Sequence, residues 1–133
     1  MKTLQCTLTV TLKASPEAVF DLLTASKKIP LWCGGQKGGV QSKVGGKFSM
    51  FDGWVNGSVL AFERGKRLSY TWMPGDWPES TTPSIVTYAF SKSSKGTKIA
   101  LVHFGFPNQK EMKGHKSGWT EYVFDPLKTF LSP

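Results

Sequence analysis

The 133-residue sequence contains few of the residue types from which catalytic and metal sites are built: two cysteines, two histidines and two arginines. Two cysteines, Cys6 and Cys33, cannot form the framework of a disulfide-rich domain. No apolar run approaches the roughly 20 residues that cross a bilayer. The first residues alternate in polarity, unlike the apolar segment of a secretory signal. We therefore expect a single domain over residues 1–133, located in the cytoplasm and without a membrane span.

Arginine is scarce although the chain is basic. The net charge is +8 at pH 7 against nine acidic residues, and nearly all of the positive charge is lysine, spread over expected turns and one helix face. Recognition of bases and phosphates relies heavily on the planar guanidinium group of arginine. The lysines therefore indicate a solvated surface, and we expect no nucleic-acid partner.

A phosphate-binding motif is missing too. Residues 33–46, CGGQKGGVQSKVGG, hold six glycines and two lysines, but they match neither GxxxxGK[ST] nor GxGxxG between a strand and a helix. This composition predicts a mobile loop, which we interpret as a hinged lid over a pocket. Cys33 begins the loop and is expected to be an inert thiol, because only Lys37 lies near enough in sequence to lower its pKa.

Alternation typical of strands fills most of the chain. From Thr3 to Leu12 every second residue is apolar and the others are mainly threonine, which predicts a half-buried strand. Further segments alternate in the same way and are joined by short turns, which predicts antiparallel pairing: Lys47–Phe51, Trp54–Phe62, Leu68–Trp72, Ile85–Phe90 and Thr97–Phe104. We expect a bulge at Asn56–Gly57, and we expect the prolines of Met73–Pro78 to place that segment in a loop.

Two short helices are predicted after the first strand. Ser15 has the position of an N-cap, Pro16 that of the first helical residue, and Glu17 supplies an acid in the first turn. A second, shorter helical piece runs from Ser26 to Trp32.

A long amphipathic helix is predicted for Gly105–Leu131. Apolar and aromatic residues at steps of three and four fall on one face: Met112, His115, Trp119, Tyr122, Val123, Leu127 and Phe130. Pro126 removes one backbone hydrogen bond, but the apolar period continues beyond it, so we expect a kink rather than an end. So wide an apolar face requires a cover, which the strands can provide. The elements together predict an α+β fold: a curved antiparallel sheet of about seven strands wrapped around the C-terminal helix, with a cavity between them.

Several segments in order resemble one known family. They are Ser15–Asp21, Trp32, Gly45–Phe48, Gly57–Phe62, Leu68–Trp72, Gly96–Ile99, His103–Pro107, Gly118–Trp119, Leu127 and Phe130. These residues are similar to the activator of heat-shock-protein-90 ATPase homologue, C-terminal-domain-like family. The resemblance implies the helix-grip fold, also called START-like, SRPBCC or Bet v 1-like, whose members mostly hold hydrophobic ligands under the C-terminal helix.

The two histidines are the main titratable groups expected near that cavity. His103 shares a strand face with Ile99 and Leu101, and His115 shares the helix face with Trp119. An acid–base or metal role is one interpretation, and a hydrogen-bonded core histidine is the other. No cysteine or carboxylate accompanies them at ligand spacing, so we assign no catalytic residue, no metal ligand and no cofactor.

Aromatic residues are the best candidates for lining the cavity. The expected lining residues are Trp32, Phe48, Met50, Tyr70, Trp72, Tyr88, Leu101, His103, His115, Trp119, Tyr122 and Val123. An aromatic cage for a flat ligand would draw on Trp54, Trp72, Trp77, Trp119, Phe104 and Phe106, although a core of this size would use the same residues.

Three functions remain open at this point. The first is binding of a small hydrophobic or aromatic molecule in the cavity. The second is a stress-response role with a chaperone partner, and the third is a cyclase- or hydrolase-type enzyme that uses His103 or His115. We expect a monomer or a weak homodimer.

Overall fold

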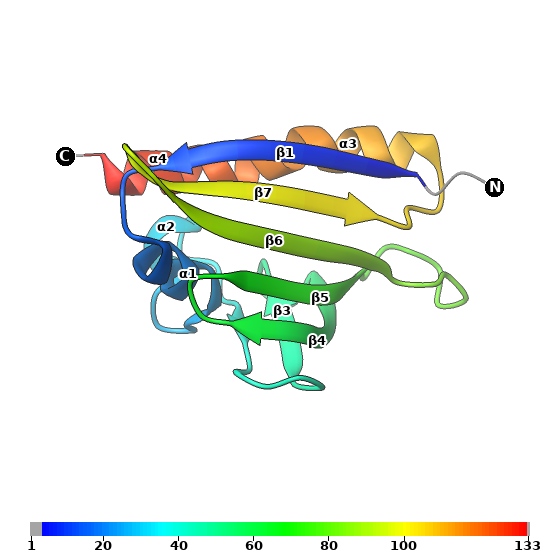
Figure 1. Ribbon diagram of the computed structural model, residues 1–133. Coiled ribbons are helices and arrows are strands. Elements are labelled where there is room, and N and C mark those ends of the chain that lie inside the picture. The colour runs from blue at the N-terminus through cyan, green and yellow to red at the C-terminus, as the bar shows by residue number, and fades with distance from the viewer. Residues whose placement is uncertain (1–3, 133) are drawn as a thin grey trace.

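The computed structural model describes residues 4–132, which form one seven-stranded antiparallel sheet with helices on one side of it (Figure 1). The strands are β1 (Gln5–Leu12), β2 (Gly39–Val40), β3 (Lys47–Met50), β4 (Val55–Glu63), β5 (Arg67–Pro74), β6 (Ser84–Ser93) and β7 (Gly96–Phe104). The helices are α1 (Pro16–Thr24), α2 (Ile29–Trp32), α3 (Gln109–Trp119), a π-helical segment η1 (Thr120–Phe124) and α4 (Asp125–Leu131). The sheet order is β1-β7-β6-β5-β4-β3-β2, so the α+β helix-grip architecture expected from the sequence is confirmed.

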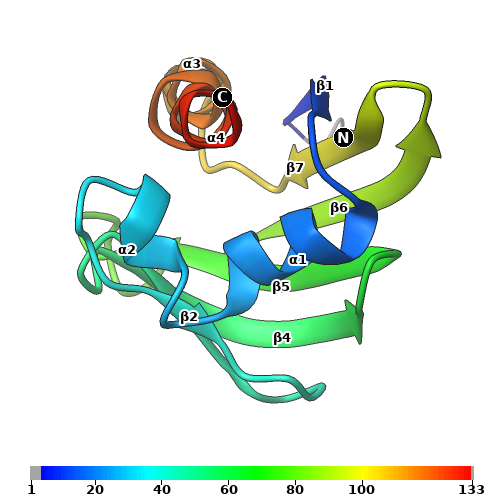
Figure 2. The ribbon, with the colours of Figure 1, turned by 90° about the vertical axis from the view of Figure 1, so that its left-hand side faces the viewer.

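The sheet curls strongly from β1 to β4. Seen along the C-terminal helix, it surrounds α1 on its concave side, and α3 and α4 lie next to β1 (Figure 2). The C-terminal helix thus closes the open side of the curl. Among the described helices, none has the length and apolarity that a bilayer crossing requires.

The first strand and helix follow the sequence pattern. Cys6, Val10 and Leu12 of β1 are buried, while the threonines between them face outward. The hydroxyl of Ser15 accepts a hydrogen bond of 3.2 Å from the backbone N–H of Ala18, which caps α1.

The middle strands differ from expectation in two places. The β-bulge lies between Val59 and Ala61, not at Asn56–Gly57. Gly57 is needed for a different reason: a Cβ there would lie 1.8 Å from the carbonyl oxygen of Thr71 on the neighbouring strand. Strand β5 also continues past Trp72 to Pro74, where the missing N–H is tolerated because β6 no longer pairs beyond Trp72.

The glycine-rich segment is only partly a loop. Gly39 and Val40 pair with β3 as strand β2. Gly38 packs so closely against β3 that a Cβ would meet the carbonyl oxygen of Ser49 at 2.9 Å. The absence of side chains therefore lets this segment lie flat against the sheet.

The C-terminal helix contains the largest departure from the predicted pattern. It begins at Gln109 rather than Gly105. Just before Pro126 it contains the π-helical segment η1, where the backbone N–H of Asp125 donates to the carbonyl of Thr120. A π turn adds a residue and shifts the phase of every side chain after it. Tyr122, predicted on the inner face, is consequently 59% exposed, and Phe124 is buried in its place.

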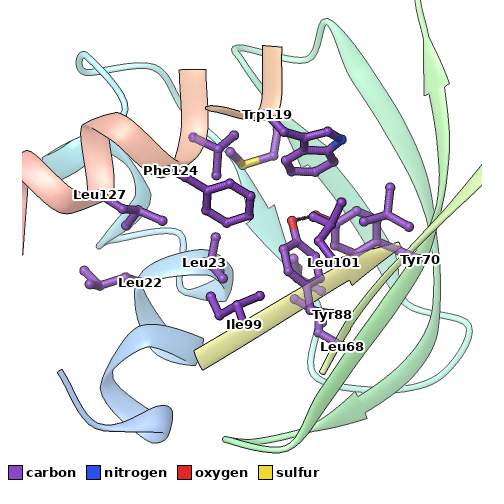
Figure 3. Packing of buried hydrophobic residues seen from close by; sticks show 14 of the residues in the cluster. Leu22, Leu23, Leu68, Tyr70, Tyr88, Ile99, Leu101, Trp119, Phe124 and Leu127 are labelled. Carbon is purple, nitrogen blue, oxygen red and sulfur yellow. Dashed lines mark hydrogen bonds between the residues drawn. The ribbon is translucent and has the colours of Figure 1, made fainter. Parts of the chain in front are cut away.

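Phe130 shows the same shift, since it was predicted on the inner face and is 43% exposed. The positions Trp119, Val123 and Leu127 stay buried as predicted. Figure 3 shows Trp119, Phe124 and Leu127 pointing from this helix toward Leu23, Ile99 and Tyr88 in the core.

Candidate binding cleft beside the C-terminal helix

The space between the sheet and the C-terminal helix is mostly filled by aromatic side chains. The rings of Phe48 and Tyr70 stack with centroids 3.7 Å apart. The hydroxyls of Tyr70 and Tyr88 share a 2.6 Å hydrogen bond, drawn as a dashed line in Figure 3. Burial raises the pKa of both tyrosines, so the pair stays neutral. A small space among these side chains, bordered by Met50 and Trp119 among others, has a volume of about 10 Å³, the size of about one water molecule.

An open cleft lies at the edge of this core, between α3 and the turn that joins β3 to β4. Its volume is about 220 Å³. The lining residues are Phe51, Trp54, Trp72, Glu111, Gly114, His115, Gly118, Trp119, Tyr122 and Val123. Aromatic rings therefore form most of its surface.

Two helical glycines keep the cleft open. Gly114 and Gly118 lie one turn apart on α3 and both face the cleft. A Cβ on Gly114 would meet no atom within 4 Å, and one on Gly118 would meet only Tyr122, at 3.7 Å. Glycine inside a helix costs roughly 0.5–1 kcal/mol relative to alanine. No other element packs closely enough against these positions to exclude a side chain. The effect of the two glycines is therefore to leave the volume of the cleft open.

His103 lies in the core behind the cleft and is completely buried. Its Nδ1 accepts a 3.0 Å hydrogen bond from the indole N–H of Trp119, and its Nε2 lies 2.8 Å from the hydroxyl of Ser84. Because Ser84 donates its own proton to the carbonyl of Trp72, Nε2 of His103 is the donor of that pair. Burial, with a smaller effect from His115, lowers the pKa of His103 to about 2.

His115 belongs to a second set of hydrogen bonds, which lies along the wall of the cleft. Its Nε2 accepts from the indole N–H of Trp72 at 3.1 Å, and its Nδ1 lies 2.9 Å from the backbone carbonyl of Glu111. The carboxylate of Glu111 accepts a 2.7 Å bond from the indole N–H of Trp77. Both nitrogens of each histidine therefore have partners within the protein, which leaves no free lone pair for a metal or a substrate proton.

The structure separates the twelve predicted lining residues into groups. Five line the open cleft: Trp72, His115, Trp119, Tyr122 and Val123. Phe48, Met50, Tyr70, Tyr88, Leu101 and His103 are buried in the core behind it. Trp32 lies elsewhere, at a groove between α2 and α4, where its indole N–H bonds the carbonyl of Leu22 at 2.7 Å.

Sequence reasoning missed four cleft residues, Phe51, Glu111, Gly114 and Gly118. The two helical glycines were a usable signal, because they interrupt a helix at a spacing of four residues. Phe51 carries no such signal in the sequence. It lines the cleft from the β3–β4 turn, where its backbone has a positive φ of 55°.

The glycine-rich segment, interpreted as a lid, does not line this cleft. Its first residue, Cys33, is buried, and burial with a further effect from Asp52 raises the pKa of the thiol to about 11. Across residues 4–132, no three side chains of histidine, cysteine, aspartate or glutamate gather in the manner of a metal site.

A family model and a curated relative that match this chain carry similar descriptions. Residues 13–132 match the family model described as Activator of Hsp90 ATPase homolog 1-like protein. The chain is 27% identical over 126 residues to the mouse "Activator of 90 kDa heat shock protein ATPase homolog 1", a match that spans 95% of this chain and 36% of the mouse protein.

Solved structures agree on the fold. A crystal structure of an HSP90 activator from Plasmodium falciparum superposes with a TM-score of 0.84 at 28% identity, over 96% of both chains. The solution structure of the Aha1 dimer from Colwellia psychrerythraea, at 19% identity over 96% of this chain and 95% of that one, has a TM-score of 0.77 and supports the fold alone. With most of its length matched by the family model and the same architecture in its relatives, the chain belongs to the Activator of Hsp90 ATPase homolog 1-like protein family.

Proposed function

We propose that this protein binds a small aromatic or apolar molecule in the cleft beside α3. The observation that carries the proposal is the cleft itself, about 220 Å³ in volume and lined mostly by aromatic rings. A buried apolar cavity of about 150 Å³ accommodates benzene in another protein, so this volume suits a ligand of one or two rings. The neighbouring space in the core has a volume of only about 10 Å³, too small for a lipid chain.

The two glycines supply a direct test. Leucine at position 114 would project into the cleft, where no atom lies within 4 Å of its Cβ, and leucine is a better helix former than glycine. Ser117 is exposed on the same helix and does not line the cleft, so Ser117→Leu is the matched control.

The experiment measures binding of indole, 2-naphthol and 2-phenylethanol by two-dimensional amide NMR titration. We expect at least one compound to shift the amides around the cleft. Gly114→Leu is expected to weaken that binding at least roughly tenfold, and Ser117→Leu to leave it unchanged. If no compound binds, or if the filled cleft binds as well as the open one, the proposal is wrong.

A second candidate function is association with an Hsp90-type chaperone. It rests on the printed names of the mouse and Plasmodium relatives, each about a quarter identical to this chain over nearly all of it. Since the chain spans about a third of the mouse protein's length, a chaperone activity of the whole relative does not transfer without a test. The test is the ATP turnover of the chaperone from the same cell with and without this protein, and an unchanged rate at saturating protein would exclude the role.

A further inference from the structure

The charge of the cleft is opposite to that of the whole chain. The protein has 17 basic and nine acidic residues, yet Glu111 is the one charged side chain among the described residues that line the cleft. No lysine or arginine within residues 4–132 lines it. A ligand in this cleft therefore meets a carboxylate in an aromatic surrounding.

The Glu111 carboxylate is held in place. The backbone N–H of Glu111 donates a 2.9 Å hydrogen bond to the side-chain oxygen of Asn108, which caps the helix. Glu111 therefore lies in the first turn of α3, where the helix dipole favours a negative charge. One carboxylate oxygen accepts the indole N–H of Trp77. For the other oxygen, no side chain or backbone group among residues 4–132 provides a hydrogen-bond donor, and the side chain of Glu111 is 31% exposed.

Aromatic rings surround His115, which lies one helical turn after Glu111 on α3. The ring of His115 lies 5.7 Å from the ring of Trp77 and 6.3 Å from that of Trp54, which stacks at an interplanar angle of 24°. Trp54 meets Trp72 edge to face, with centroids 6.4 Å apart, and Trp54 remains 42% exposed. The negative faces of such rings attract a cation placed within about 6 Å of the ring centre.

The histidine rings already have hydrogen-bond partners. In each ring one nitrogen accepts a hydrogen bond from an indole N–H. Protonation of either ring would turn that acceptor into a second donor and break the bond.

From this arrangement we propose that the ligand of the cleft is a small organic cation, an ammonium group on an aromatic or branched apolar body, bound by the Glu111 carboxylate and by the partly exposed ring of Trp54. This inference rests on the proposed binding function of the cleft and adds its ligand class. The apolar body would fill the space left by Gly114 and Gly118, and the ammonium would bond the free oxygen of Glu111.

The experiment compares two probes of the same shape, phenylethylammonium and 2-phenylethanol, by isothermal titration at pH 7.5 and low salt. Wild-type protein is expected to bind the cation roughly tenfold more tightly than the alcohol. In Glu111→Gln, whose amide oxygen can still accept from Trp77, the affinity ratio should fall to about one. Glu121→Gln removes the same charge from an exposed position of the helical segment outside the cleft and should preserve the tenfold ratio.

The outcomes separate the two proposals. If neither probe binds while indole or 2-naphthol does, the cation proposal fails and the binding function stands. If none of the four compounds binds, the cleft is not a small-molecule site and both proposals fail. If both probes bind equally to wild type, or if the preference for the cation survives in Glu111→Gln or is lost equally in Glu121→Gln, the cleft binds small molecules but its ligand is not a cation recognised by Glu111.

Discussion

Mild acid is expected to destabilise this protein through His103. The ring is fully buried and bonded in its neutral form, and its pKa is lowered from 6.5 to about 2, chiefly by burial. In the unfolded chain the same side chain takes up a proton near pH 6.5. Between these two values the unfolded state binds a proton that the folded state cannot bind. The contribution of His103 to stability is therefore complete above about pH 6.5 and is lost progressively as the pH falls toward 2.

The magnitude follows from the linkage slope of about 1.4 kcal/mol per pH unit for one proton. From pH 7.5 to 5.0, an unfolded-state pKa of 6.5 gives a loss of about 2 kcal/mol in the free energy of unfolding. A pH of 5.0 lies above the ordinary range of carboxylates, so these groups add little to the change. A loss of this size is a substantial part of the stability of an ordinary domain.

The assay is urea unfolding followed by tryptophan fluorescence at pH 7.5 and pH 5.0, for wild type and His103→Gln. Glutamine does not titrate, and its amide can donate to Ser84 in place of Nε2. Subtracting the two proteins removes the effects of His115 and of the carboxylates. Wild type should lose about 2 kcal/mol more than the variant between the two pH values.

Parallel pH dependence in the two proteins would refute this reasoning about His103. A second measurement does not depend on the variant folding. In wild type, the imidazole carbon-bound proton signals of His103 should not move between pH 7.5 and pH 5.0, and a titration midpoint in that interval would contradict the buried neutral ring.

Three further predictions concern stability and reactivity. Gly114→Ala should raise the free energy of unfolding by about 1 kcal/mol, because its Cβ meets no atom within 4 Å and the helix gains propensity; a thermal melt with no upward shift would contradict this. Gly57→Ala should lower the free energy of unfolding by about 3 kcal/mol, because its Cβ would lie 1.8 Å from the carbonyl oxygen of Thr71, and denaturant unfolding measures the loss. At pH 8, Cys33 should react with a thiol reagent at least roughly 100-fold more slowly in the folded protein than in urea, because its pKa is raised to about 11; equal rates would show that the thiol is not buried.

Most of the fold was predictable from local pattern. The alternation of β1 and the N-cap at Ser15 appear in the structure where the sequence predicts them. These features depend on side-chain period and on backbone chemistry within a few residues, which a sequence displays directly. The family resemblance is confirmed as well, and it rests on residues spread along nearly the whole chain.

Some of the aromatic residues at the candidate cleft were named from the sequence, but their arrangement was not. Trp72, His115 and Trp119 were named as lining residues and do line the cleft. Trp32 was named too, but it packs at a different groove, since an aromatic residue beside a loop does not reveal which wall it joins. Glu111 resembles an ordinary first-turn acid in the sequence, and its place in the cleft depends on Trp77, 34 residues away.

The sequence by itself determined most of the strands, the cap at Ser15, the antiparallel pairing of neighbouring strands and the amphipathic character of the C-terminal helix. Each of these depends on a short-range period or on the chemistry of a few neighbouring residues. Only the tertiary structure decided which aromatic rings fill the core and which leave a cleft. The π segment at Thr120–Phe124 turned Tyr122 outward and Phe124 inward, a shift of phase that periodicity does not anticipate. Glycine also has two different roles that the sequence does not distinguish. At Gly57 it allows close contact with a neighbouring strand, and at Gly114 it leaves open space, because the surroundings of each glycine are set only by the folded chain.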